Sequence, residues 1–476
     1  MTGRTGRTER LTAREVIALV TDDDRFSELP APVRNFKPDG PLSWQGYDDS
    51  RARAATRTGE EESVVCGRAV IGGTPAVLIA FEFGFLGGSL GERTGDRLEA
   101  AYTYAREHRL PVVPLVATGG SRMQEGMLAL TQLQRVARQS ALTREAGLAQ
   151  IAVLRDPTTG GGWATLGAGA DVTLALPGAQ VGFAGSRVRP PDADPAAYTA
   201  EAQVAAGAVD AVVRPEELRE TLALWLKLLT NPGPSSSPSS NPNPGSSPGR
   251  STESGAEAPT PPPALGSAHL PTTGWEAVQH ARAPQRPRAA AYLEAYFTHR
   301  AAISGDRCGG TDASMLCGFG LTPGGRTIAY AAQCGTATRP AGYRTAARLI
   351  RLAGRLGFPV LTLVDTPGAA NDADAERQGA GSAIADLFAA VATACTPVTT
   401  LVIGEGGSGG ALALAAPGNT WATPDSYFSV IAPELAAAIL KRPTGEVRST
   451  ADQLRIRPQD LVELGVIRGI TENRKE

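Results

Sequence analysis

The sequence predicts an α/β protein that contains two copies of one domain. Helical and short apolar segments alternate in both halves, and matching segments recur at an almost constant offset. Between the halves, residues 231–274 are dominated by Pro, Ser and Gly and have few large apolar side chains. We therefore expect domains at residues 1–230 and 275–476, joined by a disordered linker that cannot form a core of its own.

The repeat keeps its register over several consecutive elements. Residues 110–120 (LPVVPLVATGG) match residues 358–368 (FPVLTLVDTPG), and Pro111 and Pro359 are 248 residues apart. The apolar positions of the helix before each strand have the same offset. In the next turn, the glycine pair Gly160 and Gly161 is placed opposite Gly409 and Gly410, at an offset of 249.

A β-hairpin is expected to open each copy. In the first half, residues 64–70 and 75–81 flank a Gly-Gly turn, and in the second half residues 329–332 follow a turn at 323–325. Short strands and helices then alternate. Ligands of such open sheets bind at the loops beyond the strand ends, which is where the glycine turns lie.

Composition narrows the function classes. The 476 residues include 46 Lys and Arg against 48 Asp and Glu, so no basic surface suggests nucleic acid. No apolar run has the length of a membrane span, and the N-terminus lacks the apolar core of a secretory signal, so a soluble, cytoplasmic protein is expected. The five cysteines lack metal-ligand spacing and only four histidines are present, so we expect no zinc.

Residues 401–415 (LVIGEGGSGGALALA) form the most distinctive segment. An apolar run is followed by five glycines within seven positions and then by small apolar residues, which predicts a strand, a tight turn and a helix. Glycine lets a ligand approach the backbone closely, and the first turn of a helix presents amides without intrahelical acceptors. An oxyanion or a phosphate is therefore the expected ligand.

Three motifs fit these glycines. With Ser408 as a nucleophile the segment resembles a G-x-S-x-G elbow, but the general-base His of that fold follows the Ser, and the last His here is His299. With Gly404, Gly406 and Gly409 it fits the dinucleotide pattern, but that pattern belongs to the first βαβ unit, whereas two strand–helix units precede it here. The third interpretation is an oxyanion hole made of backbone amides. Glycines that serve only helix packing are the structural alternative.

Longer motifs in both halves resemble one enzyme family. The first half is similar to the β subunit of bacterial acetyl-CoA carboxylase carboxyltransferase, and the second half to its α subunit. The matching segments are FEFGFLGGSLGE (81–92), EHRLPVVPLVATGGSRMQEG (107–126), DPTTGG (156–161) and PGAQVGFAG (177–185), then PQRPRAAAYLEAYF (284–297), VDTPGA (364–369) and LVIGEGGSGGALAL (401–414). The resemblance implies a fused β–α chain with two crotonase-type domains.

The resemblance also implies an activity and a site. The family transfers a carboxyl group from carboxybiotin, held on a separate carrier protein, to acetyl-CoA, giving malonyl-CoA for fatty acid or polyketide synthesis. By this resemblance Gly160 and Gly161 hold the thioester oxygen, and Gly409 and Gly410 hold the ureido oxygen of biotin. It further implies biotin carboxylase and a biotin carboxyl carrier protein as partners, and a homodimer or larger assembly.

Residues around these glycines have two interpretations. Gly119, Gly120 and Arg122 match the family's pocket loop and are expected to contact CoA, although an Arg beside a glycine turn equally suits a structural ion pair. Glu125 and Glu405 are expected to cap or pair near helix starts rather than to act as acids.

Some segments depart from the family pattern. The zinc ribbon of the β subunit has no counterpart, residues 370–372 replace a Tyr-Pro-Gly run, the basic segment before Tyr343 is shortened to 334–342, and Gly162 and Trp163 replace small or β-branched residues. Two alternatives therefore stay open. One is a decarboxylase that forms the same enolate from a malonyl-type thioester, and the other is a non-catalytic scaffold of a carboxylase complex.

Overall fold

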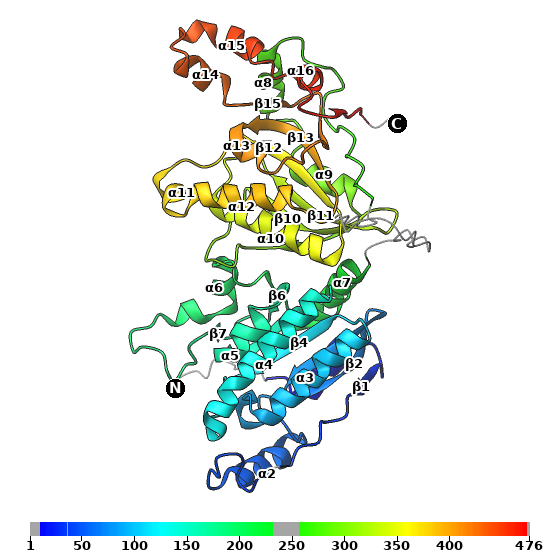
Figure 1. Ribbon diagram of the computed structural model, residues 1–476, viewed down its shortest axis with the longest axis vertical. Helices are drawn as coiled ribbons and strands as arrows, with labels where there is room; N and C mark the ends of the chain where they lie inside the picture. Colours follow the sequence, from blue (N-terminus) through cyan, green and yellow to red (C-terminus); the bar gives the residue numbers. More distant parts are fainter. Residues whose placement is uncertain (1–9, 36, 232–256, 474–476) are drawn as a thin grey trace, which may run out of the picture. The chain divides into compact units, whose positions relative to one another are not determined.

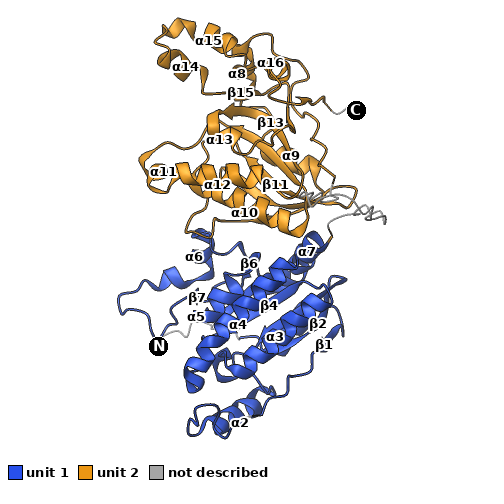
Figure 2. Ribbon diagram, in the orientation of Figure 1, with its two compact units in different colours: residues 1–230 blue, residues 231–476 orange. Residues whose placement is uncertain are grey.

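The computed structural model describes residues 10–35, 37–231 and 257–473. The chain divides into two compact units, residues 1–230 and 231–476 (Figure 2). Each unit has a sheet and hydrophobic clusters of its own. Within the described residues, no helix combines the length and the apolar character needed to cross a membrane.

The first unit is built on an eight-stranded sheet with the order β1-β2-β3-β4-β5-β6-β8, and β7 pairs with β5. The first three strands are antiparallel and the following pairs are parallel. Its strands are β1 (Phe26–Glu28), β2 (Val64–Ile71), β3 (Thr74–Phe81), β4 (Val112–Thr118), β5 (Ile151–Thr159), β6 (Val172–Ala175), β7 (Val181–Gly182) and β8 (Ala211–Val212). The predicted hairpin is confirmed as β2 and β3.

Helices α3 (Glu92–Glu107) and α4 (Gly126–Glu145) lie side by side over one face of this sheet (Figure 1). α3 buries Leu98, Ala101, Tyr102 and Ala105, the apolar face expected from the sequence, against residues of β2, β3 and β4. The other helices of the unit are α1 (Ala13–Val20), α2 (Tyr47–Thr58), the short α5 (Gly160–Gly162), α6 (Ala200–Ala205) and α7 (Leu218–Thr230).

The second unit has the same arrangement, with the order β16-β14-β13-β12-β11-β10-β9 and β15 paired with β13. Its strands are β9 (His299–Ile303), β10 (Met315–Leu321), β11 (Thr327–Gln333), β12 (Val360–Thr366), β13 (Val398–Gly407), β14 (Thr420–Ala422), β15 (Tyr427–Ser429) and β16 (Gly469–Ile470). The hairpin predicted here is β10 and β11.

Amphipathic α10 (Pro340–Leu356) and α12 (Ala380–Ala392) pack together on this second sheet (Figure 1). The remaining helices are α8 (Gly274–Arg282), α9 (Ala289–Tyr296), α11 (Ala373–Arg377), α13 (Ser408–Leu412), α14 (Pro433–Ile439), α15 (Val447–Gln453) and α16 (Pro458–Glu463). The sequence repeat is therefore a repeat of one α/β unit.

The two units agree in small details at the ends of β4 and β12. In each, the pairing with the next strand shifts register just before the strand ends, and the final Thr accepts a hydrogen bond from the Gly two residues on. The Gly120 amide donates to Thr118 Oγ1 at 3.0 Å, and the Gly368 amide donates to Thr366 Oγ1 at 3.2 Å. These positions are 248 residues apart, so the repeat places two loops of the same construction at equivalent strand ends.

The prediction of a disordered linker over residues 231–274 is wrong for its last part. Residues 257–273 are described and lie on the second unit, while residues 232–256 lie outside the described part of the chain. The carbonyl of Pro259 accepts a hydrogen bond from Thr399 Oγ1 at 2.7 Å, and that of Thr260 accepts one from Tyr296 at 2.8 Å. Extended Pro-rich chain forms no internal hydrogen bonds, so its carbonyls are free to accept bonds from a neighbouring surface.

Candidate active site at two glycine turns

The first glycine turn connects β5 to α5. Gly160 has φ +62°, a left-handed conformation that favours glycine, and its amide donates to the Phe183 carbonyl at 3.0 Å. Helical backbone then continues through Trp163–Gly167, whose bonds have π-helical spacing. The amides that face no intrahelical acceptor are therefore those after Gly160, at Gly161 and Gly162.

The second turn connects β13 to α13 in the same way. β13 ends at Gly407, and Ser408 has φ +60° although it is not glycine. Ser408 is therefore the counterpart of Gly160, and both lie directly after the equivalent strand ends.

This correspondence corrects the offset expected from the sequence. Gly409 and Gly410 correspond to Gly161 and Gly162 at the common offset of 248, whereas the sequence had paired them with Gly160 and Gly161 at 249. The residue in the left-handed conformation is Gly160 in the first unit but Ser408 in the second. Aligning the two sequences by their glycines therefore shifted the alignment by one residue.

Packing explains why most of these positions are glycine. A Cβ on Gly161 would lie 2.3 Å from the Leu133 side chain, and a Cβ on Gly162 would lie 2.3 Å from the methyl group of Thr118. A Cβ on Gly410 would lie 2.5 Å from the Ala369 amide nitrogen. A Cβ on Gly409 would meet no described atom within 4 Å, so at this position packing alone does not require glycine.

The loop after β4 lies against the first turn, as expected for a pocket loop. A Cβ on Gly160 would be 3.3 Å from the Gly120 Cα, so the two loops touch. The amide of Gly119 donates to Gly87 O at 2.9 Å, and the amide of Gly120 is held by Thr118. Both amides are already bonded within the protein, so Gly119 and Gly120 shape this edge of the site rather than offering donors to a ligand.

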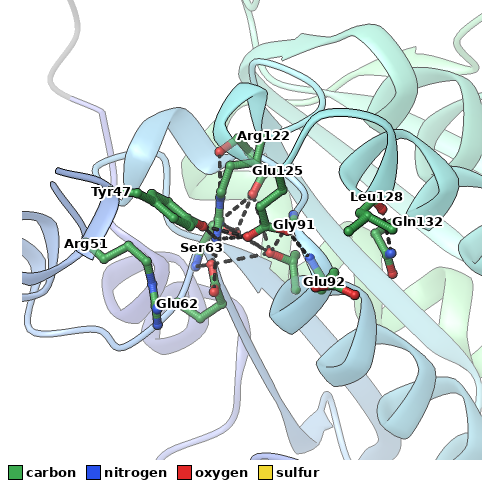
Figure 3. Close-up of polar contacts among 12 residues, drawn as sticks. Tyr47, Arg51, Glu62, Ser63, Gly91, Glu92, Arg122, Glu125, Leu128 and Gln132 are labelled. Carbon is green, nitrogen blue, oxygen red and sulfur yellow. Dashed lines mark hydrogen bonds and ion pairs between the residues drawn. The ribbon is translucent and has the colours of Figure 1, made fainter. Parts of the chain in front are cut away.

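Arg122, which was expected to contact CoA or to form a structural ion pair, lies in a buried ion pair. Its side chain has no exposed surface and forms a two-pronged ion pair with Glu62, which is also fully buried (Figure 3). It also donates to the Ser89 carbonyl at 2.7 Å and to the Tyr47 hydroxyl at 3.2 Å. The structure therefore contains the structural ion pair that an Arg beside a glycine turn also suggested.

Glu125 completes this cluster and holds the start of α3. Its carboxylate accepts hydrogen bonds from the Tyr47 hydroxyl and from the Glu92 amide, both at 2.6 Å (Figure 3). Glu92 is the first residue of α3, so the negative charge lies where the helix dipole favours it. Burial alone would raise the pKa of Glu62, but the charge and hydrogen bonds of Arg122 outweigh burial and lower it.

A second buried ion pair holds the strand ends of the second unit. Asp365, fully buried near the end of β12, accepts from Arg286 at 2.6 Å and from Arg288 at 3.2 Å. It also accepts from the Glu405 amide at 3.2 Å, just before the glycine turn. This pair was not predicted from the sequence. Its only signal was that both partners fall in family-matching segments, PQRPR and VDTPGA.

Glu405 and two of the residues that depart from the family pattern, Trp163 and Asp372, have structural roles. Glu405 pairs with Arg282 at 2.8 Å, as its pairing interpretation predicted. Trp163 is largely buried in an apolar cluster with Leu154, so its bulk fills the core. Asp372 caps α11, and hydrogen bonds from Arg339 and from the helix amides lower its pKa to about 2.

The geometry suits stabilisation of developing negative charge on oxygen. Each turn presents backbone amides at the beginning of a helical segment, where they carry partial positive charge and need no proton transfer. Ser408 is held in a left-handed turn, and the sequence has no His beyond His299 to act as its base. Backbone amides are therefore the groups through which each turn can act on an oxyanion.

Comparison with known proteins identifies the family. The carboxyl transferase domain family matches residues 39–207, and the acetyl co-enzyme A carboxylase carboxyltransferase-like family matches residues 268–475. The chain is 36% identical to the acetyl-coenzyme A carboxylase carboxyl transferase subunits beta/alpha of Saccharopolyspora erythraea, covering 97% of this chain and 81% of that protein. It is 38% identical to the protein of the same name in Parafrankia sp., covering 97% and 78%.

This chain belongs to the acetyl-CoA carboxylase carboxyltransferase family. It is a biotin-dependent carboxyltransferase subunit of an acyl-CoA carboxylase, with the β-like and α-like halves fused in that order. Solved structures agree on the fold of this carboxyltransferase. It aligns with transcarboxylase 12S with a TM-score of 0.75 at 20% identity, covering 97% of this chain and 87% of that one. The TM-score is 0.71 at 19% identity with a single-chain, multi-domain long-chain acyl-CoA carboxylase, covering 97% and 46%.

Proposed function

We propose that this carboxyltransferase acts on acetyl-CoA and forms malonyl-CoA. The observation that carries this proposal is the match to fused subunits named for acetyl-CoA carboxylase, at 36–38% identity over 97% of the chain. Carboxybiotin on a separate carrier protein supplies the carboxyl group.

In the proposed reaction the N–C bond of carboxybiotin breaks and releases CO₂. The ureido nitrogen then accepts a proton from the acetyl methyl group, and the resulting enolate carbon forms a new C–C bond with CO₂. Two oxygens carry negative charge during this sequence, namely the thioester oxygen and the ureido oxygen. Two glycine turns are present, one for each of the two oxygens.

We assign the thioester oxygen to the first unit and the ureido oxygen to the second. Since the Gly160 amide is bonded to Phe183, the donors proposed for the thioester are Gly161 and Gly162. Gly409 and Gly410 are proposed for the ureido oxygen. A donor aimed at a developing oxyanion contributes about 2.7–4 kcal/mol in comparable sites, so these four amides can supply much of the required stabilisation.

The proposed partners are biotin carboxylase and a biotin carboxyl carrier protein, and the proposed state is a cytoplasmic homodimer or larger assembly. An assembly would cover large apolar side chains that are exposed in both units. They are Met123, Met127 and Phe183 in the first unit and Leu412, Val430 and Leu435 in the second.

The test is to incubate the purified chain with carboxylated carrier protein and a series of acyl-CoAs. Labelled malonyl-CoA formed from acetyl-CoA in preference to longer acyl-CoAs is the expected result. Preference for another acyl-CoA would overturn the substrate assignment. Release of CO₂ from malonyl-CoA without biotin would indicate the decarboxylase, and inactivity in both assays would indicate the scaffold.

A further inference from the structure

A buried glutamine lies under the second glycine turn. Gln333 is the last residue of β11, and its side chain is fully buried. Its amide nitrogen is 3.1 Å from the Gly410 carbonyl oxygen and 3.3 Å from Thr338 Oγ1. A carbonyl can only accept, so the Gln333 atom facing Gly410 is the NH₂ group, and the orientation of the side-chain amide is fixed.

This contact fixes a helix that has few hydrogen bonds of its own. α13 has five residues, and the Leu414 amide turns back to the Ala411 carbonyl. The Gly410 carbonyl instead accepts from Gln333, a residue 77 positions away in the sequence. The Gly410 carbonyl shares one peptide plane with the Ala411 amide, so the contact with Gln333 fixes this plane and, through the Gly410 Cα, restrains the first turn of the helix before it.

Through Thr338, the same glutamine is also connected to the loop that follows β12, at residues 367–369. The backbone of Thr338 pairs with Ala369, whose neighbour Gly368 accepts from the Thr338 amide at 3.2 Å. Gly410 lies against this loop, because a Cβ on Gly410 would be 2.5 Å from both the Ala369 nitrogen and the Tyr343 hydroxyl. The NH₂ group of Gln333 is therefore hydrogen-bonded both to the glycine turn, at Gly410, and to Thr338, which pairs with the loop at 368–369.

We propose that Gln333 is a positioning residue for the biotin side of the reaction. Its amide holds the carbonyl of Gly410 so that the amides of Gly409 and Gly410 point together at the ureido oxygen. This inference rests on the proposed function for the role of those amides. The contact between Gln333 and Gly410 does not depend on it.

The experiment replaces Gln333 with Met, which is similar in size but cannot donate, and with Glu, which when ionised can only accept. The full-length protein is assayed in the reverse direction with malonyl-CoA and biocytin. For both variants we expect the KM for biocytin to rise roughly fivefold or more, as expected for loss of the two buried hydrogen bonds of the Gln333 NH₂ group, with the KM for malonyl-CoA unchanged.

Thr362→Val is the matched control. Thr362 Oγ1 donates to the Leu414 carbonyl at 3.0 Å and shares a hydrogen bond with Thr400 Oγ1 at 2.6 Å. This variant therefore also loses two buried hydrogen bonds, one of them to the segment after the turn, but away from Gly410. A comparable loss of stability with an unchanged KM for biocytin is expected. If the KM for biocytin rose as much in Thr362→Val as in Gln333→Met, loss of stability alone would explain the effect, and the proposal would be overturned.

Hydrogen exchange gives a readout that does not depend on activity. Amides of residues 408–412 are expected to exchange faster in Gln333→Met and Gln333→Glu than in wild type or Thr362→Val. Unchanged exchange in the Gln333 variants, or wild-type kinetics in Gln333→Glu, would overturn the positioning role. Inactive wild type with malonyl-CoA and biocytin would instead count against the proposed function, and the exchange data would still decide the contact.

Discussion

Gly409 and Gly410 are neighbours in one short helix, but they differ in what surrounds them. Gly410 is buried against backbone atoms of the loop at 368–369, whereas a Cβ on Gly409 would point into open space. Substitution at Gly410 therefore perturbs the fold and the site together. Gly409 is the position at which the two effects can be separated.

We predict that Gly409→Ala keeps the fold and loses activity. Ala favours helix over Gly by about 0.8–1.0 kcal/mol, so the free energy of unfolding should be equal or slightly higher. The added methyl group should obstruct the ureido oxygen and lower biotin-dependent turnover roughly tenfold or more. Steady-state kinetics and urea unfolding measure the two effects. Gly410→Ala is the comparison and should lose both, and full activity of Gly409→Ala would contradict the assigned donor.

The buried pair of Arg122 and Glu62 is a second feature at the scale of single residues. It joins the loop before α4 to the residues before β2, and it lies beside Glu125, which binds the start of α3 (Figure 3). Through these contacts it holds the loop that follows β4.

We predict that Glu62→Gln lowers the free energy of unfolding by about 3–5 kcal/mol, because it leaves the buried Arg122 charge without its partner. The folded-state pKa of Glu62 is lowered, so its contribution is fully present above the unfolded pKa of about 4.3 and is lost as the pH falls through the lower, folded value. Urea unfolding between pH 7 and pH 3 should show a shallower loss of stability in the variant. Glu217→Gln, which affects an exposed pair with Arg214, should change stability little.

At the scale of secondary structure, the two strand–turn–helix segments have the same backbone conformation at the turn but different residues in it. Each needs a left-handed residue directly after the strand that leads into the turn, β5 or β13, and the first unit has Gly160 where the second has Ser408. A residue with a Cβ is strained in this conformation by about 1–2 kcal/mol, whereas glycine is not.

A reciprocal pair of substitutions should reveal this strain. Ser408→Gly is expected to raise the free energy of unfolding by up to about 1 kcal/mol, and Gly160→Ser to lower it by about 1–2 kcal/mol. Chemical denaturation of both variants measures the difference. Activity of Ser408→Gly should be retained, and its loss would restore a chemical role for the Ser408 hydroxyl.

The sequence was informative wherever local chemistry determines structure. The hairpins, the strand-turn-helix segments and the 248-residue repeat follow from apolar periodicity and glycine turns. The burial of Arg122 could not be predicted, because its partner Glu62 is 60 positions away and an Arg beside a glycine turn suits a ligand equally well. The contact of Gln333 with Gly410 was missed for the same reason, since a Gln at a strand end gives no sign of a distant partner.

At the scale of the whole molecule, the chain consists of two units with separate cores, and the second includes residues 257–273. This segment is attached at several points. The Leu265 amide donates to the Tyr292 hydroxyl at 3.1 Å, and Ala264 pairs with Asn473 near the other end of the chain. Composition predicted disorder for this segment, because composition contains no information about the surface of the second unit on which the segment lies.

We predict that the fragment 257–476 is more stable than the fragment 275–476. Both contain the second sheet, but only the longer one keeps the hydrogen bonds to Thr399, Tyr292 and Tyr296. At about 0.5–1.5 kcal/mol for each hydrogen bond, the difference should exceed about 1.5 kcal/mol. Thermal unfolding of the two fragments compares them, and equal melting temperatures would indicate that the segment is not attached in solution.

The attachment of residues 257–273 also determines how far one unit can be from the other. A chain spans at most about 3.3–3.6 Å per residue, so the covalent limit falls from roughly 150 Å for a connection over residues 231–274 to roughly 90 Å for residues 231–256. A shorter connection changes the effective concentration of each unit near its covalent neighbour. The position at which the chain rejoins the second unit thus sets the balance between association within one polypeptide and exchange between two.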